Sequence, residues 1–292
     1  MDRLRDMDCY IYRSVRTLIF VFTTTLLLSG CEQNDAANAR RLIVQKHAPR
    51  VAQIVIQDIQ RHFAGLEKAA TRIAPGFVRV QGAQQEKDIR KVLRLIRHPI
   101  KGVEQLIITP MSFIAAVDKN GVVIARDTEP DRMKGMNLAE LFPVVKQALS
   151  GEQGYAVGQF RAMKKGEQPS VTIIMAVPSR YQNEVVGGLV VGIPLWRLAQ
   201  RLSRQLQAEH AGKGVVLWVY VYRGEKLYHY GTPHSMDELV PSAEERRKGL
   251  SKSPGGFTGE VAQFGSFYGF GVRPIRILGD DIGVVIFRMD PK

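Results

Sequence analysis

The sequence predicts an α+β protein made of two similar modules, each an antiparallel five-stranded sheet with helices on one side, preceded by a long N-terminal helix. Three observations lead to this prediction. A length of 292 residues is enough for two domains. The order helix, hairpin, helical insert and three strands occurs twice, as a repeat of pattern with weak sequence identity. Short apolar runs joined by turn residues, with grouped helices, are typical of the α+β class.

Residues 1–30 have the pattern of an export signal. After four arginines comes an apolar core, Leu18–Leu28, of 11 residues, which is short of the roughly 20 that span a bilayer as a helix. It ends in Leu28-Ser29-Gly30-Cys31, which resembles the bacterial lipobox at all four positions. That resemblance implies that the peptide before Cys31 is removed and that the Cys31 thiol carries lipid with acyl chains such as palmitate. The alternative is a signal anchor with a cysteine there by chance.

Lipidation of Cys31 would hold the protein at the cell envelope. Cys9 would leave with the signal, so the folded part would have no thiol for catalysis or metal binding. The chain has 41 basic and 28 acidic side chains. Outside the cytoplasm this charge is expected to face anionic lipid or an acidic ligand, and no nucleic-acid partner is expected. Glu32 after the cysteine favours the periplasmic side of an outer membrane, by the same resemblance.

The mature chain is predicted to begin with a tether and a long helix. Residues 31–41 are polar and short, as in a flexible linker. Apolar residues at spacings of three and four over Val51–Leu66 predict the helix. This helix either has Pro49 in its first turn or is a longer helix from near Ala39 that is kinked at the proline. Pro75-Gly76 is expected to end it.

The rest of the first module, residues 42–200, alternates between helical and extended patterns. A shorter helix is predicted over Gln85–Arg97. Asn120-Gly121 lies between the apolar runs Phe113–Val117 and Val122–Ala125, and predicts a hairpin because both turn residues tolerate positive φ. The hairpin is followed by a polar loop, Arg126–Asn137, and by a helical insert, Leu138–Leu149, that is interrupted at Pro143. Three strands complete the module: Gly154–Arg161, Ser170–Pro178 and Glu184–Pro194.

The second module, residues 201–292, repeats this plan. Leu195–His210 is predicted to be an amphipathic connecting helix, because its leucines recur at near-helical spacing. The polar segment Pro233–Leu250 is the second helical insert, and Asp280-Asp281 is expected to be a turn. Five strands are predicted: Val215–Tyr222, Lys226–Tyr230, Gly256–Phe264, Ser266–Pro274 and Ile282–Arg288.

Three stretches of the first module resemble the Cache domains, which are extracellular PAS-like sensor modules of bacteria. A hairpin of the pattern v-D-x-x-G-x-v-l-a, a G-x-x-l insert and a v-x-G-x-l last strand occur in the family's order: Ala116–Asp127, Gly135–Leu138 and Val186–Gly192 after Ala176-Val177-Pro178. Their spacing over residues 39–200, with a long helix ahead of the sheet, carries the resemblance. Residues 213–291 are assigned to the partner module of a double Cache arrangement from pattern alone.

The resemblance implies a ligand pocket between the concave face of the sheet and the helical insert. Members of the family bind amino acids, carboxylates, amines or purines and signal to an output domain. They often pair through the long helix, so a homodimer through Val51–Ile73 is expected. No transmembrane helix or output domain is recognised after the sensor part. We therefore expect a sensor that depends on a separate signalling partner.

Five residues are candidates for ligand contact: Arg126, Phe142, Tyr155, Met175 and Val177. Arg126 ends the second strand just before the insert, where its guanidinium could clamp a carboxylate through two hydrogen bonds. The alternative is a surface arginine paired with Asp127 or Glu129. Phe142 is expected to cap the cavity, and the other three to line one of its walls. The alternative for these residues is an ordinary core.

The second module is rich in aromatic residues. The two-residue period of a strand places Trp218, Tyr220 and Tyr222 on one face. That face could stack a flat ligand, pack against the long helix or dock a partner. The alternative function is therefore an envelope structural or interaction protein with filled cores and an aromatic docking surface. The sequence has no HExxH, G-x-S-x-G or P-loop pattern, so no enzyme, metal site or cofactor is predicted.

Overall fold

The computed structural model describes residues 37–160, 169–263 and 265–290. The predicted export signal and Cys31, the predicted lipidation site, lie outside the described residues. Within them, two antiparallel five-stranded sheets follow one long helix, which confirms the predicted fold class. No helix in these three ranges is both long and apolar enough to cross a membrane.

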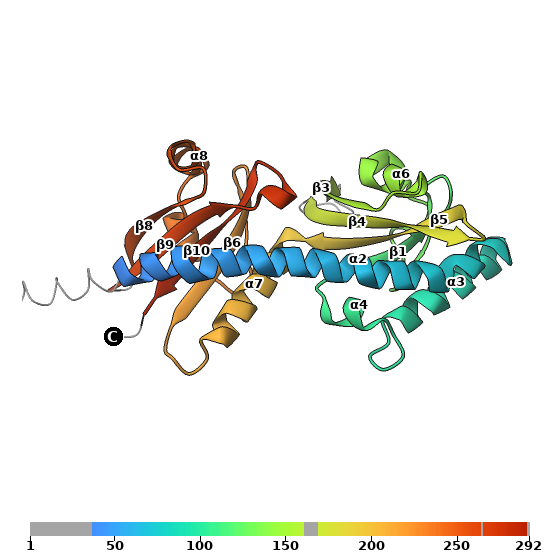
Figure 1. Cartoon of the computed structure of the whole chain (residues 1–292), viewed down its shortest axis with the longest axis horizontal. Helices are drawn as coiled ribbons and strands as arrows, with labels where there is room; N and C mark the ends of the chain where they lie inside the picture. The colour runs from blue at the N-terminus through green and yellow to red at the C-terminus, as the bar shows by residue number, and fades with distance from the viewer. Residues whose placement is uncertain (1–36, 161–168, 264, 291–292) are drawn as a thin grey trace, which may run out of the picture.

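One long helical segment runs along both modules (Figure 1). Residues 37–42 are helical, η1 is a π-helical turn over Ile43–His47, and α2 continues over Ala48–Val78. The described part of the predicted tether is therefore helix, and Ala39 is only 1% exposed. The observed segment corresponds to the longer of the two predicted helices, with a π turn directly ahead of Pro49. The start of this segment and the C-terminal strand lie at the same end of the molecule (Figure 1).

The prediction that Pro75-Gly76 ends the long helix is wrong. Helix α2 continues through both residues to Val78. Pro75 removes one backbone hydrogen bond from the last turn. Packing supports that turn nonetheless, because a Cβ added to Gly76 would lie 3.2 Å from Ile89 Cγ1. Gln85 Nε2 also donates a hydrogen bond to the Phe77 carbonyl. These tertiary contacts outweigh the effect of a helix-breaking residue.

The first sheet has the strand order β2-β1-β5-β4-β3. Its strands are β1 (Phe113–Val117), β2 (Val123–Arg126), β3 (Gly154–Phe160), β4 (Ser170–Tyr181) and β5 (Glu184–Pro194). The shorter helices of this module are α3 (Gly82–Ile96), α4 (Glu104–Ile108), α5 (Leu138–Leu141) and α6 (Pro143–Leu149). Pro143 begins α6, so the predicted interruption of the insert is confirmed.

The two tight turns of this sheet have different backbone conformations. Gln182 and Asn183 both have positive φ, of 50° and 67°, in the hairpin between β4 and β5. In the β1–β2 turn only Gly121 has positive φ, of 83°. Asn120 does not need it, because the Asp118 side chain accepts hydrogen bonds from the backbone N–H groups of Asn120 and Val122. The Asp side chain therefore forms part of a turn that we predicted from Asn-Gly alone.

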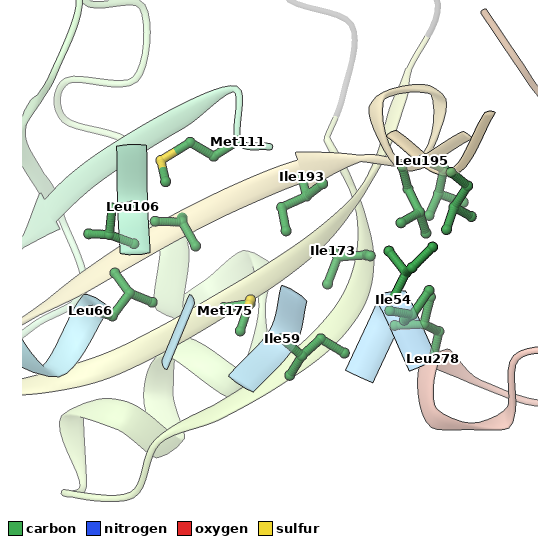
Figure 2. Close-up of a cluster of buried hydrophobic side chains, with 14 of the residues drawn as sticks. Ile54, Ile59, Leu66, Leu106, Met111, Ile173, Met175, Ile193, Leu195 and Leu278 are labelled. Atoms are coloured by element: carbon green, nitrogen blue, oxygen red, sulfur yellow. The ribbon is translucent and has the colours of Figure 1, made fainter. Parts of the chain in front are cut away.

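Helices cover both faces of the first sheet, whereas the prediction placed them on one side (Figure 1). Ile173 and Met175 of β4 point toward α2, where they pack in one core with Ile59 and Leu66 (Figure 2). The alternate residues Ile174 and Ala176 pack instead with the insert helices α5 and α6. We call the second side the insert face. Because both faces are buried, these strands are apolar along their length.

The second module repeats the first. Its sheet has the order β7-β6-β10-β9-β8. The strands are β6 (Val216–Arg223), β7 (Lys226–Tyr228), β8 (Phe257–Gln263), β9 (Ser266–Pro274) and β10 (Ile282–Met289). The helices are α7 (Leu195–Glu209), η2 (His234–Leu239), α8 (Ala243–Lys252) and η3 (Arg276–Leu278). Strand β10 lies between β6 and β9, just as β5 lies between β1 and β4.

A single hydrophobic cluster contains residues of both modules. Ile54 of α2 lies beside Leu195, at the start of α7, and Leu278 of η3 (Figure 2). The same cluster extends along α2 to Leu66, under the first sheet, and includes Val219 of the second. The apolar stripe of α2 is therefore covered by both sheets in turn.

Candidate functional site

Arg126 lies on the insert face of the first sheet. It pairs with Ala115 across the β1–β2 hairpin, and paired residues of antiparallel strands point to the same face. Ala115 packs with Phe113 and Val117 in the core under α5 and α6. Strand β2 is an edge strand, so the guanidinium is at one border of the space between the sheet and the insert. Arg126 is the last residue of β2, as predicted, while its contact with a ligand stays a prediction.

The Arg126 side chain forms no ion pair with another described residue. Its Nε and Nη2 both donate to the Thr128 hydroxyl oxygen, at 2.9 and 2.5 Å. The two predicted alternative partners are engaged elsewhere. Asp127 pairs with Arg97 at 2.5 Å, and Glu129 pairs with two arginines of α3. Among the described residues, the Arg126 guanidinium therefore hydrogen-bonds only to a neutral acceptor.

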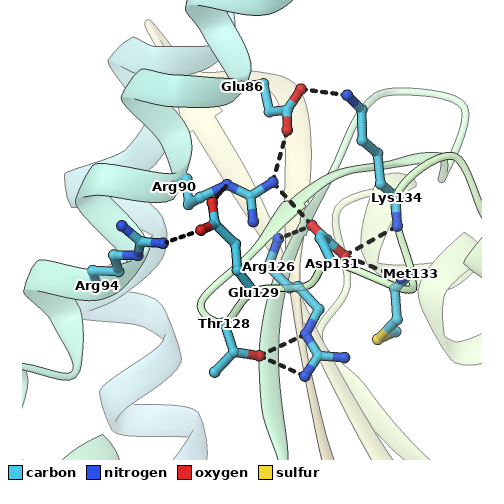
Figure 3. A network of polar contacts seen from close by, with 9 residues as sticks. All are labelled: Glu86, Arg90, Arg94, Arg126, Thr128, Glu129, Asp131, Met133 and Lys134. Atoms are coloured by element: carbon cyan, nitrogen blue, oxygen red, sulfur yellow. Dashed lines mark hydrogen bonds and ion pairs between the residues drawn. The ribbon is translucent and has the colours of Figure 1, made fainter.

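Asp131 fixes the loop that follows Arg126 (Figure 3). Its Oδ2 accepts the backbone N–H of Arg126 at 2.9 Å and lies 3.3 Å from Arg90 Nη2. Its Oδ1 accepts the N–H groups of Met133 and Lys134, at 3.0 and 3.1 Å. Met133 is buried in the core of the insert face. One carboxylate thereby positions both a charged and an apolar residue of the candidate site.

Three phenylalanine rings contact one another on the insert face. The Phe160 ring makes edge-to-face contacts with Phe142 at 4.8 Å and with Phe113 at 5.8 Å between ring centroids. Phe142 lies on Gly158 of β3, where an added Cβ would be 2.4 Å from the ring. Phe113 lies on Gly192 in the same way, at 2.2 Å. Phe142 lies over the sheet, and its predicted role as the cap of a ligand cavity stays a prediction. Phe113, Phe160 and Met133 were not predicted to belong to this face.

Tyr155, Met175 and Val177 do not face the insert. All three pack with the core on the α2 side, and the Tyr155 ring lies 6.2 Å from that of Phe63 on α2. Burial raises the pKa of the Tyr155 hydroxyl. The structure therefore separates these three residues from Arg126 and Phe142 by the thickness of the sheet. The residues that do face the insert on these strands are one position away, at Ala156, Ile174 and Ala176.

Most of the aromatic face of the second module is core, since Tyr220 and Tyr222 are buried and Trp218 is half-buried. Trp218, Tyr220 and Tyr222 share one side of β6, as predicted, and pack with Met236 and Val240 of the second insert. Tyr220 is fully buried and its hydroxyl donates to Asp237 Oδ1 at 2.9 Å. Burial, together with this carboxylate, raises the pKa of the Tyr220 hydroxyl. These residues therefore do not form the aromatic docking surface that the alternative function required.

The described residues contain no group of three or more histidine, cysteine, aspartate or glutamate side chains arranged to hold a metal ion. No known sequence family and no curated protein matches the chain. Solved structures do match. The ligand-binding domain of the Campylobacter jejuni chemoreceptor Tlp3 in complex with L-norvaline has a TM-score of 0.53 and 10% identity, over 89% of this chain and 92% of the other.

Two further solved structures match the chain over a similar length. The V. cholerae histidine kinase DctB sensor domain has a TM-score of 0.50 and 14% identity, over 85% of this chain and 95% of the other. The Tlp3 domain in complex with L-valine has a TM-score of 0.51 and 10% identity, over 92% and 96%. The chain has the double Cache fold. The match spans both modules of these Cache sensor domains, so the second-module assignment made from pattern alone is correct as a fold.

Proposed function

We propose that this chain is a non-enzymatic Cache sensor that binds a small molecule with a carboxylate group at the insert face of the first module. The carrying observation is Arg126, a guanidinium at the border of that face without an ionic partner among the described residues. A carboxylate in place of the Thr128 hydroxyl would accept charge-assisted hydrogen bonds, which are about twice as strong as neutral ones. The amino acids in the matched Tlp3 domains support this ligand class.

The three phenylalanine rings of the insert face would contact the apolar part of the ligand. Phe142 comes from the insert, and Phe113 and Phe160 come from the sheet. A ligand with a short apolar side chain would contact these rings while its carboxylate met Arg126. Asp131 already holds the loop that follows Arg126. Binding would therefore not need to order that loop, and little conformational entropy would be lost.

The test is thermal unfolding of the full chain in detergent with amino acids, carboxylates, amines and purines. A ligand at 100 times its Kd stabilises the folded state by about 2.7 kcal/mol, which raises Tm by roughly 5–10 °C in a chain of this size. Arg126→Ala should abolish the shift. Arg132→Ala is the matched control, because Arg132 is an exposed arginine of the same loop. A shift that survives Arg126→Ala would contradict the proposal.

The second candidate function is an envelope structural or interaction protein. It is favoured by the direct contacts among Phe113, Phe142 and Phe160, which resemble a filled core. In that case no compound of the panel changes Tm, and Phe142→Ala lowers stability by about 3–5 kcal/mol, as expected for truncation of a buried ring. The sensor function would also need a separate signalling partner, because a lipid anchor does not itself cross the bilayer.

Lipid anchoring at Cys31 on the periplasmic side of an outer membrane is part of the same proposal. Residue 37, the first described, is six positions beyond Cys31, a reach of about 20 Å at 3.3–3.6 Å per residue. The described helix begins beside the second module (Figure 1), so the anchor would hold that module near the lipid and the first module farther out. Cys31→Ala should move the protein from the membrane fraction to the soluble fraction. Equal membrane association of this variant would exclude the anchor.

A further inference from the structure

A groove of about 550 Å³ lies along α3, outside the insert face. Four cationic side chains of one helix face line it: Lys87, Arg90, Lys91 and Arg94. Their spacings of three, four and seven residues place them side by side on the helix. Glu86 and Glu129 also line the groove. A volume of this size can hold an organic molecule rather than a single ion.

The inner part of the groove is already neutralised (Figure 3). Arg90 is buried and pairs with Glu86 at 2.7 Å and with Asp131 at 3.3 Å. Lys134 pairs with Glu86 at 2.5 Å. Hydrogen bonds from Lys134 and Arg90 lower the pKa of the Glu86 carboxyl. Glu86 is therefore ionised and held by two cations, and it belongs to the fold rather than to a binding surface.

The outer part of the groove is not neutralised. Lys87 and Lys91 are one helical turn apart and form no ion pair with another described residue. Arg94 Nη2 lies 3.2 Å from Glu129, and both side chains are more than half exposed. With Lys134 and Asp131 included, five cations face three carboxylates, which leaves a net charge of +2.

The Glu129 carboxylate shows that an anionic group can bind between two guanidinium groups of the groove. Its carboxylate lies between Arg90 Nε, at 3.5 Å, and Arg94 Nη2, at 3.2 Å. The Glu129 side chain is 61% exposed, so an external anion can displace it at little cost, because exposed ion pairs contribute little. A displaced Glu129 would leave Arg94 and the two lysines facing the same small space.

We propose that this groove is a second binding site, for a small organic or phosphate anion with two or more negative charges. Lys87 and Lys91 would bind one anionic group and Arg94 another, in the position that the Glu129 carboxylate now holds. The site uses none of the insert-face residues, so this proposal does not depend on the proposed function.

Isothermal titration at low ionic strength tests it, with citrate and tripolyphosphate as the probes and the full chain in detergent as the receptor. Lys87→Ala combined with Lys91→Ala should weaken the binding of at least one probe by about fivefold or more, from the loss of two ion pairs. Lys119→Ala with Lys146→Ala is the matched control. These are two exposed lysines of the same module, in the β1–β2 turn and in α6, and neither lines the groove. Their loss changes the net charge equally. The control should keep the affinity within about twofold.

A change of opposite sign makes the test decisive. Glu129→Gln removes the internal competitor and should tighten probe binding by about twofold to threefold. Arg126→Ala should leave it unchanged, which separates this site from the insert face. The proposal is overturned if neither probe gives a saturable heat of binding of either sign, if the control variant loses as much affinity as the α3 variant, or if Glu129→Gln weakens binding.

Discussion

Replacing Asp131 with asparagine should destabilise the first module, although the two side chains have nearly the same shape. Each carboxylate oxygen accepts from its own set of donors: Oδ2 from Arg126 N–H and Arg90, and Oδ1 from the N–H groups of Met133 and Lys134. An asparagine has one oxygen and one NH₂ group. In either orientation the NH₂ group therefore faces two donors, and those donors lose their acceptor.

The magnitude follows from these contacts. The Asp131 side chain is buried, and a hydrogen bond to a charged group contributes about 1.5–3 kcal/mol. Two such bonds fail in either orientation. The smaller loss is expected with the NH₂ group in place of Oδ1, because the exposed Lys134 N–H can then bind water instead. We expect a loss of about 2–4 kcal/mol, or roughly 4–16 °C in Tm.

Urea unfolding followed by circular dichroism measures this loss. Asp88→Asn is the matched control, because Asp88 is a partly exposed aspartate of α3 whose side chain accepts one hydrogen bond, from Gln84 Nε2, among the described residues; it should change stability by less than about 0.5 kcal/mol. A loss below about 1 kcal/mol for Asp131→Asn would refute the reasoning that this carboxylate holds the loop.

Three further predictions concern the long helix and the insert face. Burial, with Arg288 nearby, lowers the pKa of His47 to about 4. Below the ordinary pKa of about 6.5 the unfolded chain therefore takes up a proton that the folded chain does not. His47 alone should lower folding stability by about 2 kcal/mol between pH 7.5 and pH 5. His47→Gln should remove that part of the fall and leave the part due to His62, whose pKa is also lowered by burial. Gly158→Ala should cost about 1–3 kcal/mol, because its Cβ would meet the Phe142 ring at 2.4 Å; Phe142→Leu in the same chain should recover part of this loss if that contact is the cause. If α2 forms the predicted homodimer, Ile56, which is 41% exposed, lies at the interface, and Ile56→Glu should yield monomers by sedimentation; a wild-type chain that is monomeric at high concentration would exclude the dimer.

The order and type of the elements could be predicted from the sequence because each signal is local. The Asn-Gly turn, the proline that begins α6 and the spacing of apolar residues in α2 act within a few residues of the structure they specify. The face of the sheet on which each strand residue lies could not be predicted. Ser170–Tyr181 is apolar at successive positions because helices cover both sides, so a two-residue period gave no direction. That is why Met175 and Val177 were assigned to the wrong face.

The Asp131 loop and the cations of the α3 groove both have local sequence signals. Asp131 accepts N–H groups two and three residues later, which is the habit of aspartate in turns. The cations of α3 recur at helical spacing from Lys87 to Arg94. By contrast, no local pattern could have shown that Glu129 reaches Arg90, because these residues meet only when the loop folds back on α3.

The placement of α2 under both sheets determines how the molecule can come apart. Its apolar stripe packs on the first sheet around Leu66 and on second-module residues such as Leu278 near Ile54. Melting of either sheet would expose half of that stripe to water, at about 25 cal/mol per Å² of apolar surface. The two sheets should therefore unfold cooperatively, in a single calorimetric transition. A truncated chain that keeps α2 and only one sheet should aggregate through the uncovered half.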